Sequence, residues 1–453
     1  MTDRKQFIRF LIFEMLFWFG ITVLFNAQQY AAGWVICLLF GVWFISMRDQ
    51  ESRFLVLLSG LPFQAITKIS DGLPSVAVVL YLLFVVIYLI KSNYHFSWKV
   101  VLPILLLVLL SLIACWRFDA QVTSIISGLL MIVFATFAID MLQNTKDRIG
   151  TFVKCAWVFT LAMVVDTYSA LIFPDMPYYI SYEKQVLLDR AGRFCALNAD
   201  PNYFGQLVTI AVGFMIAMTI LYLRTKKYWF AGLSAAVALS LAVMGLTSLS
   251  KGYAVGLGVV LLLTLWFIIM EGRRSKWKIL RFVLYLAVAA VAIYLIYTYI
   301  FIPIVSSRSN VDLFTGRLDV WGNYLRMFSE QPNVVLLGMG FNNSWLNIVR
   351  YAGQLEAAHN LYIEVIGDIG VIGFALVVAL WLKAFRKVRA LAEDVTSLFM
   401  WGFLVTSFSL SASANDIMYF VVPIFTIAFS SSEYLRRPVE TTVPVFIIKE
   451  KRT

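Results

Sequence analysis

The sequence predicts an all-α polytopic membrane protein, on the strength of its composition and the length of its apolar runs. Of the 453 residues, 61% are hydrophobic and 14% are charged, whereas a soluble domain carries about 25% charged residues. Apolar runs close to the ~20 residues that cross a bilayer recur from one end of the chain to the other. A soluble globular fold is therefore excluded. A membrane β-barrel is excluded too, because its strands would be ~10 residues of alternating polarity.

We expect about fourteen transmembrane helices in one integral membrane domain that spans residues 1–453. Each expected helix corresponds to an apolar run with polar residues near its ends. The expected spans cover residues 7–25, 30–47, 54–67, 73–90, 98–116, 121–141, 151–173, 202–223, 228–244, 252–270, 279–302, 360–382, 397–412 and 416–432. Boundaries assigned in this way are accurate to about 3 residues.

Basic residues indicate the orientation of these helices. With the amino terminus in the cytoplasm, 26 of the 37 Lys and Arg residues fall in cytoplasmic segments and ten fall outside. The positive-inside rule then places both termini, including a tail at residues 438–453, in the cytoplasm. The net charge of +11 is explained by this orientation and requires no nucleic-acid partner.

Two of the expected outer segments are longer than the rest, at residues 174–200 and 303–358. The second, between expected helices 11 and 12, has room for short helices but not for an ordinary independent domain, so we expect it to lie on the membrane part. Its apolar residues recur at steps of four and three, as on one face of a helix. That stripe consists of Phe314, Leu318, Trp321, Leu325 and Phe328. Arg317 and Arg326 would lie on opposite sides of this helix, which predicts that one of them is a solvated charge.

The dipeptide His359-Asn360 lies between this long polar segment and the apolar run that begins at Leu361. Histidine changes charge near neutral pH and can take a proton from a hydroxyl group. Only two histidines occur in the chain, and this one lies at the edge of an expected membrane helix, next to a segment with several arginines. We therefore interpret it as a candidate base that acts on a lipid-linked anionic substrate. An ordinary interfacial histidine is the alternative.

Three helices expected to begin at the outer face carry features that hold an anion. The helix near residue 202 follows Asp200 and Pro201, a capping arrangement with Arg193 just upstream. The helix near residue 252 follows Lys251, and the third follows the histidine. A positive helix end with free N–H groups and a nearby cation forms a pyrophosphate site without a metal. The alternative is that these are ordinary caps and interfacial cations.

Several carboxylates fall inside expected membrane helices, where they are costly and face a bundle interior or a wet cavity. These carboxylates are Glu14, Asp166, Glu364, Asp368 and Asp416. For each of them, a structural hydrogen bond fits the sequence at least as well as a catalytic role. The outer segments contain no Asp-x-Asp pair and no carboxylate or histidine cluster, and the four cysteines form no Cys-x-x-Cys motif. No metal or other cofactor is therefore expected.

Motifs in the second half of the chain follow one another in a characteristic order. They are Gly316-Arg317, Trp321, Pro332, Gly338-Met339-Gly340, His359-Asn360-Leu361-Tyr362, Gly370 and Gly373. Two further blocks lie upstream, Arg193 with Asn198, Pro201 and Asn202, and Ser248-Leu249-Ser250-Lys251-Gly252. Together these motifs resemble the O-antigen polymerase and O-antigen ligase superfamily. The resemblance covers residues 193–373, and the first six expected helices are similar to that family only in hydropathy.

The resemblance implies a metal-independent, inverting glycosyltransferase of GT-C type in the bacterial inner membrane, with its active site at the periplasmic face. Its donor and acceptor would be glycans on undecaprenyl pyrophosphate held among membrane lipid, and a chain-length regulator protein is a further candidate partner. The catalytic base would be His359. The residues assigned to the pyrophosphate are Arg193, Lys251 and Arg317, and those assigned to supporting contacts are Asn202, Asn360 and Tyr362.

The resemblance leaves two related activities open, and a third belongs to another class. A polymerase joins one lipid-linked repeat unit to another, whereas a ligase moves a finished glycan to lipid A-core. The polymerase is favoured by about fourteen spans and by Lys251, where many members carry arginine. Since lysine cannot give bidentate phosphate recognition, the phosphate role of Lys251 is supported less strongly than that of Arg193. The third alternative is a lipid-linked oligosaccharide flippase. The chain shows no pair of similar halves with matched broken helices, a feature of many transporters.

Overall fold

The fold was analysed in a computed structural model, which describes residues 4–68, 75–91, 98–173, 194–198, 200–271, 317–355 and 357–385, with isolated positions at 283, 298, 402–404, 406–407, 418–424 and 426. The regular elements in this part of the chain are helices. Several predictions fall wholly or largely outside these residues. They concern Arg193, Asp416, the spans at 279–302, 397–412 and 416–432, the first outer segment and the tail.

The described helices confirm a polytopic α-helical membrane protein. Those long and apolar enough to cross a membrane are α1 (Arg4–Asn26), α5 (Trp98–Phe118), α6 (Val122–Gln143), α7 (Arg148–Ile172), α8 (Pro201–Arg224), α9 (Tyr228–Leu246) and α17 (Leu361–Phe385). Further apolar helices are α2 (Tyr30–Ser46), α4 (Val76–Lys91) and α10 (Lys251–Glu271). These 7 candidate spans fit the expected positions, and the total of about fourteen stays a prediction.

The helix α3 (Gln50–Gly60) differs from the span expected at 54–67. It ends at Gly60 and continues as a 3₁₀ turn, η1 (Leu61–Phe63). Pro62 lies inside this turn, and proline has no N–H to donate and disfavours a continuing α-helix. Eleven residues at 1.5 Å each reach about 17 Å, so α3 alone is too short to cross a bilayer. From Ser52 to Gly60 every residue of α3 is buried, which makes it an internal helix.

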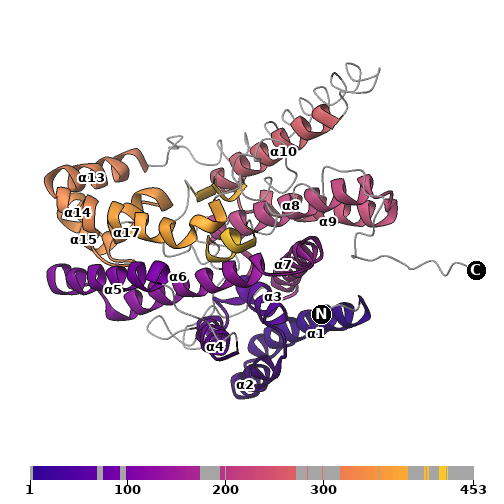
Figure 1. The fold of residues 1–453 in the computed structure, drawn as a ribbon. Helices are drawn as coiled ribbons and strands as arrows, with labels where there is room; N and C mark the ends of the chain where they lie inside the picture. The colour runs from indigo at the N-terminus through magenta and orange to yellow at the C-terminus, as the bar shows by residue number, and fades with distance from the viewer. Residues whose placement is uncertain are drawn as a thin grey trace, which may run out of the picture.

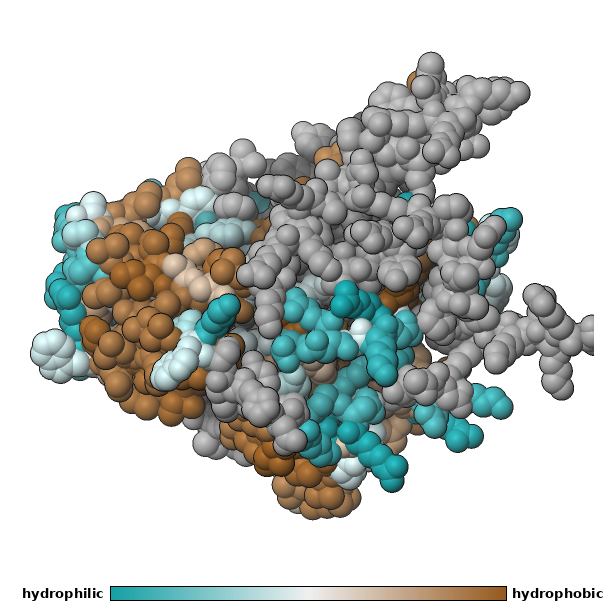
Figure 2. Space-filling view, in the orientation of Figure 1, coloured by the Kyte–Doolittle hydropathy of each residue, from teal (hydrophilic) through white to brown (hydrophobic). Residues whose placement is uncertain are grey.

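The helices α7 and α8 form the centre of the bundle. Of the most apolar 18 residues, 83% are buried in α8 and 67% in α7, against 17% in α5. α8 packs against α7, α9 and α10, and α7 also contacts α1 and α3; Figure 1 shows α8 beside α9. Figure 2 shows a broad hydrophobic surface, in brown, next to a hydrophilic area. An exposed apolar surface of this extent indicates contact with lipid.

Four short helices form a unit beside α17, which we call the α13–α16 unit. They are α13 (Arg317–Glu330), α14 (Pro332–Leu337), α15 (Ser344–Asn347) and α16 (Val349–Ala352). The unit lies next to α17 in Figure 1. Its buried core consists of Val320, Tyr324, Met327, Val334, Met339, Ile348 and Ala358. Because α13 packs on α14 and α14 packs on α17, this unit fixes the described part of the long polar stretch to a membrane helix.

The apolar stripe predicted for α13 is buried only in part. Trp321 and Phe328 pack against the core of the unit, whereas Leu318 and Leu325 are 53% and 61% exposed. The fully buried residues of this helix lie beside the stripe and are Val320, Tyr324 and Met327. Hydrophobic spacing therefore identified the helix and part of the side that packs.

A break in α17 fixes the α13–α16 unit to the bundle. Gly370 interrupts the helix with φ 66° and ψ 174°, and Gly338, after α14, has φ 77°. A Cβ on Gly338 would lie 2.2 Å from the carbonyl oxygen of Asp368, and one on Gly370 would lie 2.4 Å from that of Leu336. The N–H of Met339 donates to the carbonyl of the α17 residue 367 at 2.8 Å. Both glycines are therefore required where two backbones touch.

Candidate functional site

The N-termini of α8 and α10 lie side by side. The Asp200 carboxylate accepts hydrogen bonds from the N–H groups of Asn202 at 2.7 Å and Tyr203 at 3.3 Å, so it caps α8 as the sequence predicted. The Ser250 hydroxyl accepts from the N–H of Tyr253 at 3.3 Å, which caps α10. The same hydroxyl donates to the side-chain oxygen of Asn202 at 2.9 Å. Two positive helix ends are therefore joined by one hydrogen bond.

Close packing holds these helix ends in place. A Cβ on Gly205 would lie 2.8 Å from the Cβ of Tyr253, and one on Gly245 would lie 2.3 Å from its ring. The Tyr253 hydroxyl donates to the carbonyl of Ala242 at 2.7 Å. α8, α9 and α10 thus meet around a single buried tyrosine. Lys251, the first residue of α10, is half-buried directly after the cap.

The segment before α8 is anchored on two sides. The carboxylate of Asp166 in α7 accepts from the N–H of Leu197 at 3.2 Å and from the side-chain amide of Asn198 at 3.0 Å. The N–H of Phe194 donates to the carbonyl of Thr247 at 3.1 Å. The sequence left the role of this carboxylate open, and the structure gives it the loop in front of α8 as its partner.

Asn360 caps the helix α17. Its side-chain oxygen accepts from the N–H of Tyr362 at 3.0 Å and from that of Ile363 at 3.3 Å, which are the second and third residues of the helix. A cap of this kind satisfies N–H groups that have no partner within the helix. The buried side chain of Asn360 is therefore used by the helix itself.

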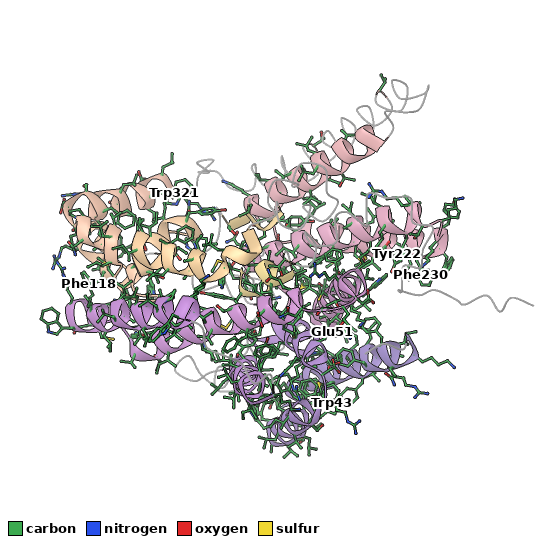
Figure 3. All side chains as sticks on the ribbon, viewed as in Figure 1. Trp43, Glu51, Phe118, Tyr222, Phe230 and Trp321 are labelled. Atoms are coloured by element: carbon green, nitrogen blue, oxygen red, sulfur yellow. The ribbon has the colours of Figure 1, made fainter. Side chains whose placement is uncertain are left out.

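His359 lies between the α13–α16 unit and α17, and its backbone is held on both sides. Its φ is 48°, a conformation that residues other than glycine adopt rarely. Its N–H donates to the Glu364 carboxylate at 3.1 Å. The indole of Trp321 donates to the carbonyl of Ala358 at 2.9 Å; Figure 3 labels this tryptophan on α13. An exposed histidine in a strained and fixed backbone is a functional candidate.

Arg317 and Arg326 have different environments, as their spacing predicted. Arg326 pairs with Glu330 at 2.9 Å, and the two side chains are 67% and 50% exposed. It is the solvated charge. Arg317 is half-buried at the start of α13, one helical turn before Trp321 on the same face. Trp321 donates a hydrogen bond to Ala358, the residue before His359. Arg317 therefore lies on the face of α13 that contacts residues 358–359.

Asp368 has a structural role that the sequence could not assign. One carboxylate oxygen accepts from the N–H of Asn342 at 2.9 Å, and the other accepts from Asn343 at 3.2 Å and Ser344 at 2.9 Å. The amide of Asn343 also donates to the carbonyl of Phe118 at the end of α5, a residue labelled in Figure 3. The buried carboxylate therefore fastens the start of α15 to the bundle.

The buried phenol of Tyr324 is not a second candidate base. Burial raises its pKa, and the nearby Glu364 and Asp368 carboxylates raise it further. The phenol therefore stays protonated at neutral pH and cannot accept a proton.

A short described segment connects the start of α17 to α8 and α10. The Tyr362 hydroxyl donates to the carbonyl of Leu404 at 2.7 Å. The amide of Gln206 in α8 donates to the Ser407 hydroxyl at 3.1 Å. A Cβ on Gly256 of α10 would lie 2.5 Å from the methyl group of residue 406. The predicted site residues thus form two groups with this segment between them.

The first group contains Asn202 and Lys251, and the second contains Arg317, His359, Asn360 and Tyr362. Arg193 lies outside the described residues. Sequence reasoning missed the contact of Trp321 with Ala358, although tryptophan commonly combines an apolar ring with one polar N–H that seeks a partner. Within the described segments, no three His, Cys, Asp or Glu side chains gather as metal ligands.

Taken together, the fold and the site define a polytopic helical membrane protein with a histidine at one helix start and a lysine at another. Residues 236–378 match the family model described as O-antigen ligase. The match includes Lys251, the α13–α16 unit, His359 and the break at Gly370. The match is confined to these residues, and it supports the O-antigen polymerase and ligase superfamily that the motifs predicted. No curated protein matches the sequence.

Proposed function

We propose that the protein is a membrane glycosyltransferase that uses a glycan carried on undecaprenyl pyrophosphate. The observation that carries the proposal is the hydrogen bond between Ser250 and Asn202, which joins the N-termini of α8 and α10 next to Lys251. Two helix ends and a cation at one place suit a doubly charged phosphate group. The match to the O-antigen ligase family supports a lipid-linked glycan as the substrate.

In this proposal, fixed positive charge stabilises the leaving group. As the bond between the anomeric carbon and the pyrophosphate oxygen breaks, its electron pair remains on the pyrophosphate. Lys251 and the ends of α8 and α10 compensate that growing charge. Arg317 belongs to the second group of site residues, on the face of α13 that contacts Ala358. It adds positive charge from that side. Arg193 is assigned the same task by its position just before the α8 loop.

His359 is the proposed base. It would take the proton of the acceptor hydroxyl while that oxygen forms a bond to the anomeric carbon, from the side opposite to the leaving group. The single displacement inverts the anomeric centre. Two hydrogen bonds support this assignment, one from Trp321 to the carbonyl of Ala358 and one from the N–H of His359 to Glu364. They fix the backbone from which the imidazole extends. Asn202, Asn360 and Tyr362 shape the site through their hydrogen bonds.

The acceptor distinguishes two candidate activities. A polymerase would use a second lipid-linked repeat unit, and the sequence favours this reaction. A ligase would use lipid A-core, and this second candidate is supported by the description of the matched family. Both would work at the periplasmic face of the inner membrane, where the basic residues orient the starts of α8, α10 and α17.

The proposal is tested with purified protein in detergent and a synthetic undecaprenyl-pyrophosphate repeat unit. A polymerase converts this substrate into a ladder of longer products without nucleotide or ion gradient, because the glycosyl pyrophosphate bond carries the energy. Transfer of a preformed glycan to lipid A-core without a ladder selects the ligase. A flippase would form no new covalent product, so the absence of product with either acceptor would contradict the proposed function.

A further inference from the structure

The Asp166 carboxylate accepts hydrogen bonds from residues outside its own helix. It lies in α7, is 0% exposed, and directs both oxygens to the turn η2 (Ala196–Asn198). The ion pairs found among the described residues join Lys154 to Glu51 and Arg326 to Glu330, and neither includes Asp166. A buried carboxylate without a cation is costly. Among the described residues, the two N–H groups of this turn offset that cost.

The turn leads directly to the proposed pyrophosphate site. The N–H of Asp200 donates to the carbonyl of Asn198 at 2.8 Å, and Asp200 caps α8 through the N–H of Asn202. The side chain of Asn202 then accepts from Ser250, the cap of α10. Hydrogen bonds therefore connect Asp166 to Ser250 without a break. Through them, Asp166 fixes where the two helix ends and Lys251 lie.

We infer that Asp166 is a positioning residue of the glycosyl-transfer site, which holds the turn before α8 so that the N-termini of α8 and α10 face the pyrophosphate. The inference rests on the proposed function and adds a residue from α7 to it. Asp166 acts through Asn198 and Asn202 and does not touch the substrate. The hydrogen bond from the N–H of Phe194 to the carbonyl of Thr247 holds the same segment from its other side.

In this contact, both side-chain oxygens of Asp166 accept a hydrogen bond. Leu197 offers an N–H to one oxygen and Asn198 offers an amide N–H to the other. An asparagine at position 166 has one acceptor oxygen and one NH₂ group, so it either places a donor against the donor of Asn198 or forces that amide to turn over. In both cases the stronger hydrogen bonds to a charged carboxylate are lost. Exchange of the two residues restores the match, since an amide at 166 can accept from Leu197 and donate to a carboxylate at 198.

The test compares Asp166→Asn, Asn198→Asp and the double exchange with the wild type. We expect each single variant to lower kcat/KM for the synthetic undecaprenyl-pyrophosphate donor by about 10-fold or more, mainly through donor KM, because a buried polar group loses its partner. The double exchange should recover most of this loss. Recovery would show a specific pairing, since two unrelated structural defects would add.

Native Cys195 gives a second readout that does not depend on glycosyl transfer. It lies directly before the turn η2 and is 2% exposed. In a background with Cys37, Cys115 and Cys155 replaced by alanine, alkylation of this thiol reports on the turn alone. We expect alkylation about 10-fold faster in each single variant and near wild-type protection in the double exchange.

The outcomes separate this inference from the proposed function. Wild-type protein that transfers no glycan would contradict the proposed function, while the alkylation rates would still decide whether Asp166 holds the turn. Near-normal transfer by Asp166→Asn, with an active wild type, would overturn the inference alone. If Asp166→Asn does not accumulate, Asn198→Ala replaces it in the test, because this variant removes one of the two bonds. It must show slower transfer and faster alkylation, both at smaller size. Unchanged transfer and alkylation in Asn198→Ala would also overturn the inference.

Discussion

At the scale of single residues, local hydrogen bonds followed from the sequence and distant ones did not. Asp200 and Asn360 were predicted near helix starts, because a cap and the N–H groups that it accepts lie within three residues. The contact of Trp321 with Ala358 joins residues 37 positions apart, and that of Ser250 with Asn202 spans 48. Local spacing contains no information about such pairs, so they appear only once the helices are packed.

The first prediction concerns the proposed base. His359→Ala should reduce glycan transfer by about 10²–10⁴-fold, the usual contribution of a general base, because the acceptor hydroxyl would lose its proton acceptor. Expression and donor binding should be retained, since Asn360 still caps α17. The measurement is the initial rate with the lipid-linked substrate at matched protein level. Replacement of His95, the other histidine of the chain, is the control. Near-normal transfer by His359→Ala would refute this role.

The second prediction compares two basic residues with different surroundings. Lys251→Ala should lower kcat/KM for the pyrophosphate donor by about 10-fold or more, because a charge at the joined helix ends is removed. Lys251→Arg should keep most of the activity. Arg326→Ala is the matched control, because this arginine is exposed and paired with Glu330, and exposed pairs contribute little. Equal effects of Lys251→Ala and Arg326→Ala would remove the lysine from the site.

At the scale of helices, hydropathy predicted where helices lie and not where they break. The run at 54–67 looked like one span, yet α3 ends at Gly60 before Pro62. The run at 360–382 also looked continuous, yet it is interrupted at Gly370. An average over an apolar window does not register a single glycine or proline. The glycine motif at 338–340 was recognised from the sequence, but its partner in α17 required the fold.

The third prediction tests the contact between α17 and the α13–α16 unit. Gly338→Ala and Gly370→Ala should each destabilise the protein by about 1–3 kcal/mol or more, because both residues have positive φ and a Cβ would overlap a backbone carbonyl. The measurement is Tm in detergent. Gly322→Ala in α13 is the control, since nothing lies within 4 Å of its added Cβ. An unchanged Tm in both test variants would show that the two backbones are not in contact.

At the scale of the whole molecule, the helical membrane class and the match to the O-antigen ligase family model were both predictable, because composition and motif order extend over long stretches of the chain. The grouping of the site residues was not. The sequence placed Lys251 and His359 at two helix starts. In the structure, the segment around Leu404 and Ser407 is bonded to α17 and to α8, and α8 is bonded to the start of α10. That segment lies in a part of the sequence to which no motif had drawn attention.

The fourth prediction concerns metal dependence. Treatment with EDTA should leave the rate of glycan transfer unchanged, because the proposed charge compensation comes from Lys251 and the helix ends, which are covalent parts of the protein. The measurement is the initial rate before and after chelation, with a metal-dependent glycosyltransferase treated in parallel. Loss of activity that returns on addition of Mg²⁺ would refute this prediction and require a metal site.

The fifth prediction concerns the side of the membrane on which the site lies. α8 has 24 residues, which reach about 36 Å at 1.5 Å each, so Asn202 and Lys226 fall on opposite sides of a hydrocarbon core of about 30 Å. Leu355 is 56% exposed and lies four positions before His359. In a background without native cysteines, Leu355→Cys should react with an impermeant maleimide in intact spheroplasts, whereas Lys226→Cys should react only after lysis. Asn202 is bonded to Ser250, so the starts of α8 and α10 lie on the same side of the membrane. Labelling of Lys226→Cys in intact spheroplasts, with Leu355→Cys labelled only after lysis, would place the whole site in the cytoplasm and contradict a periplasmic transferase.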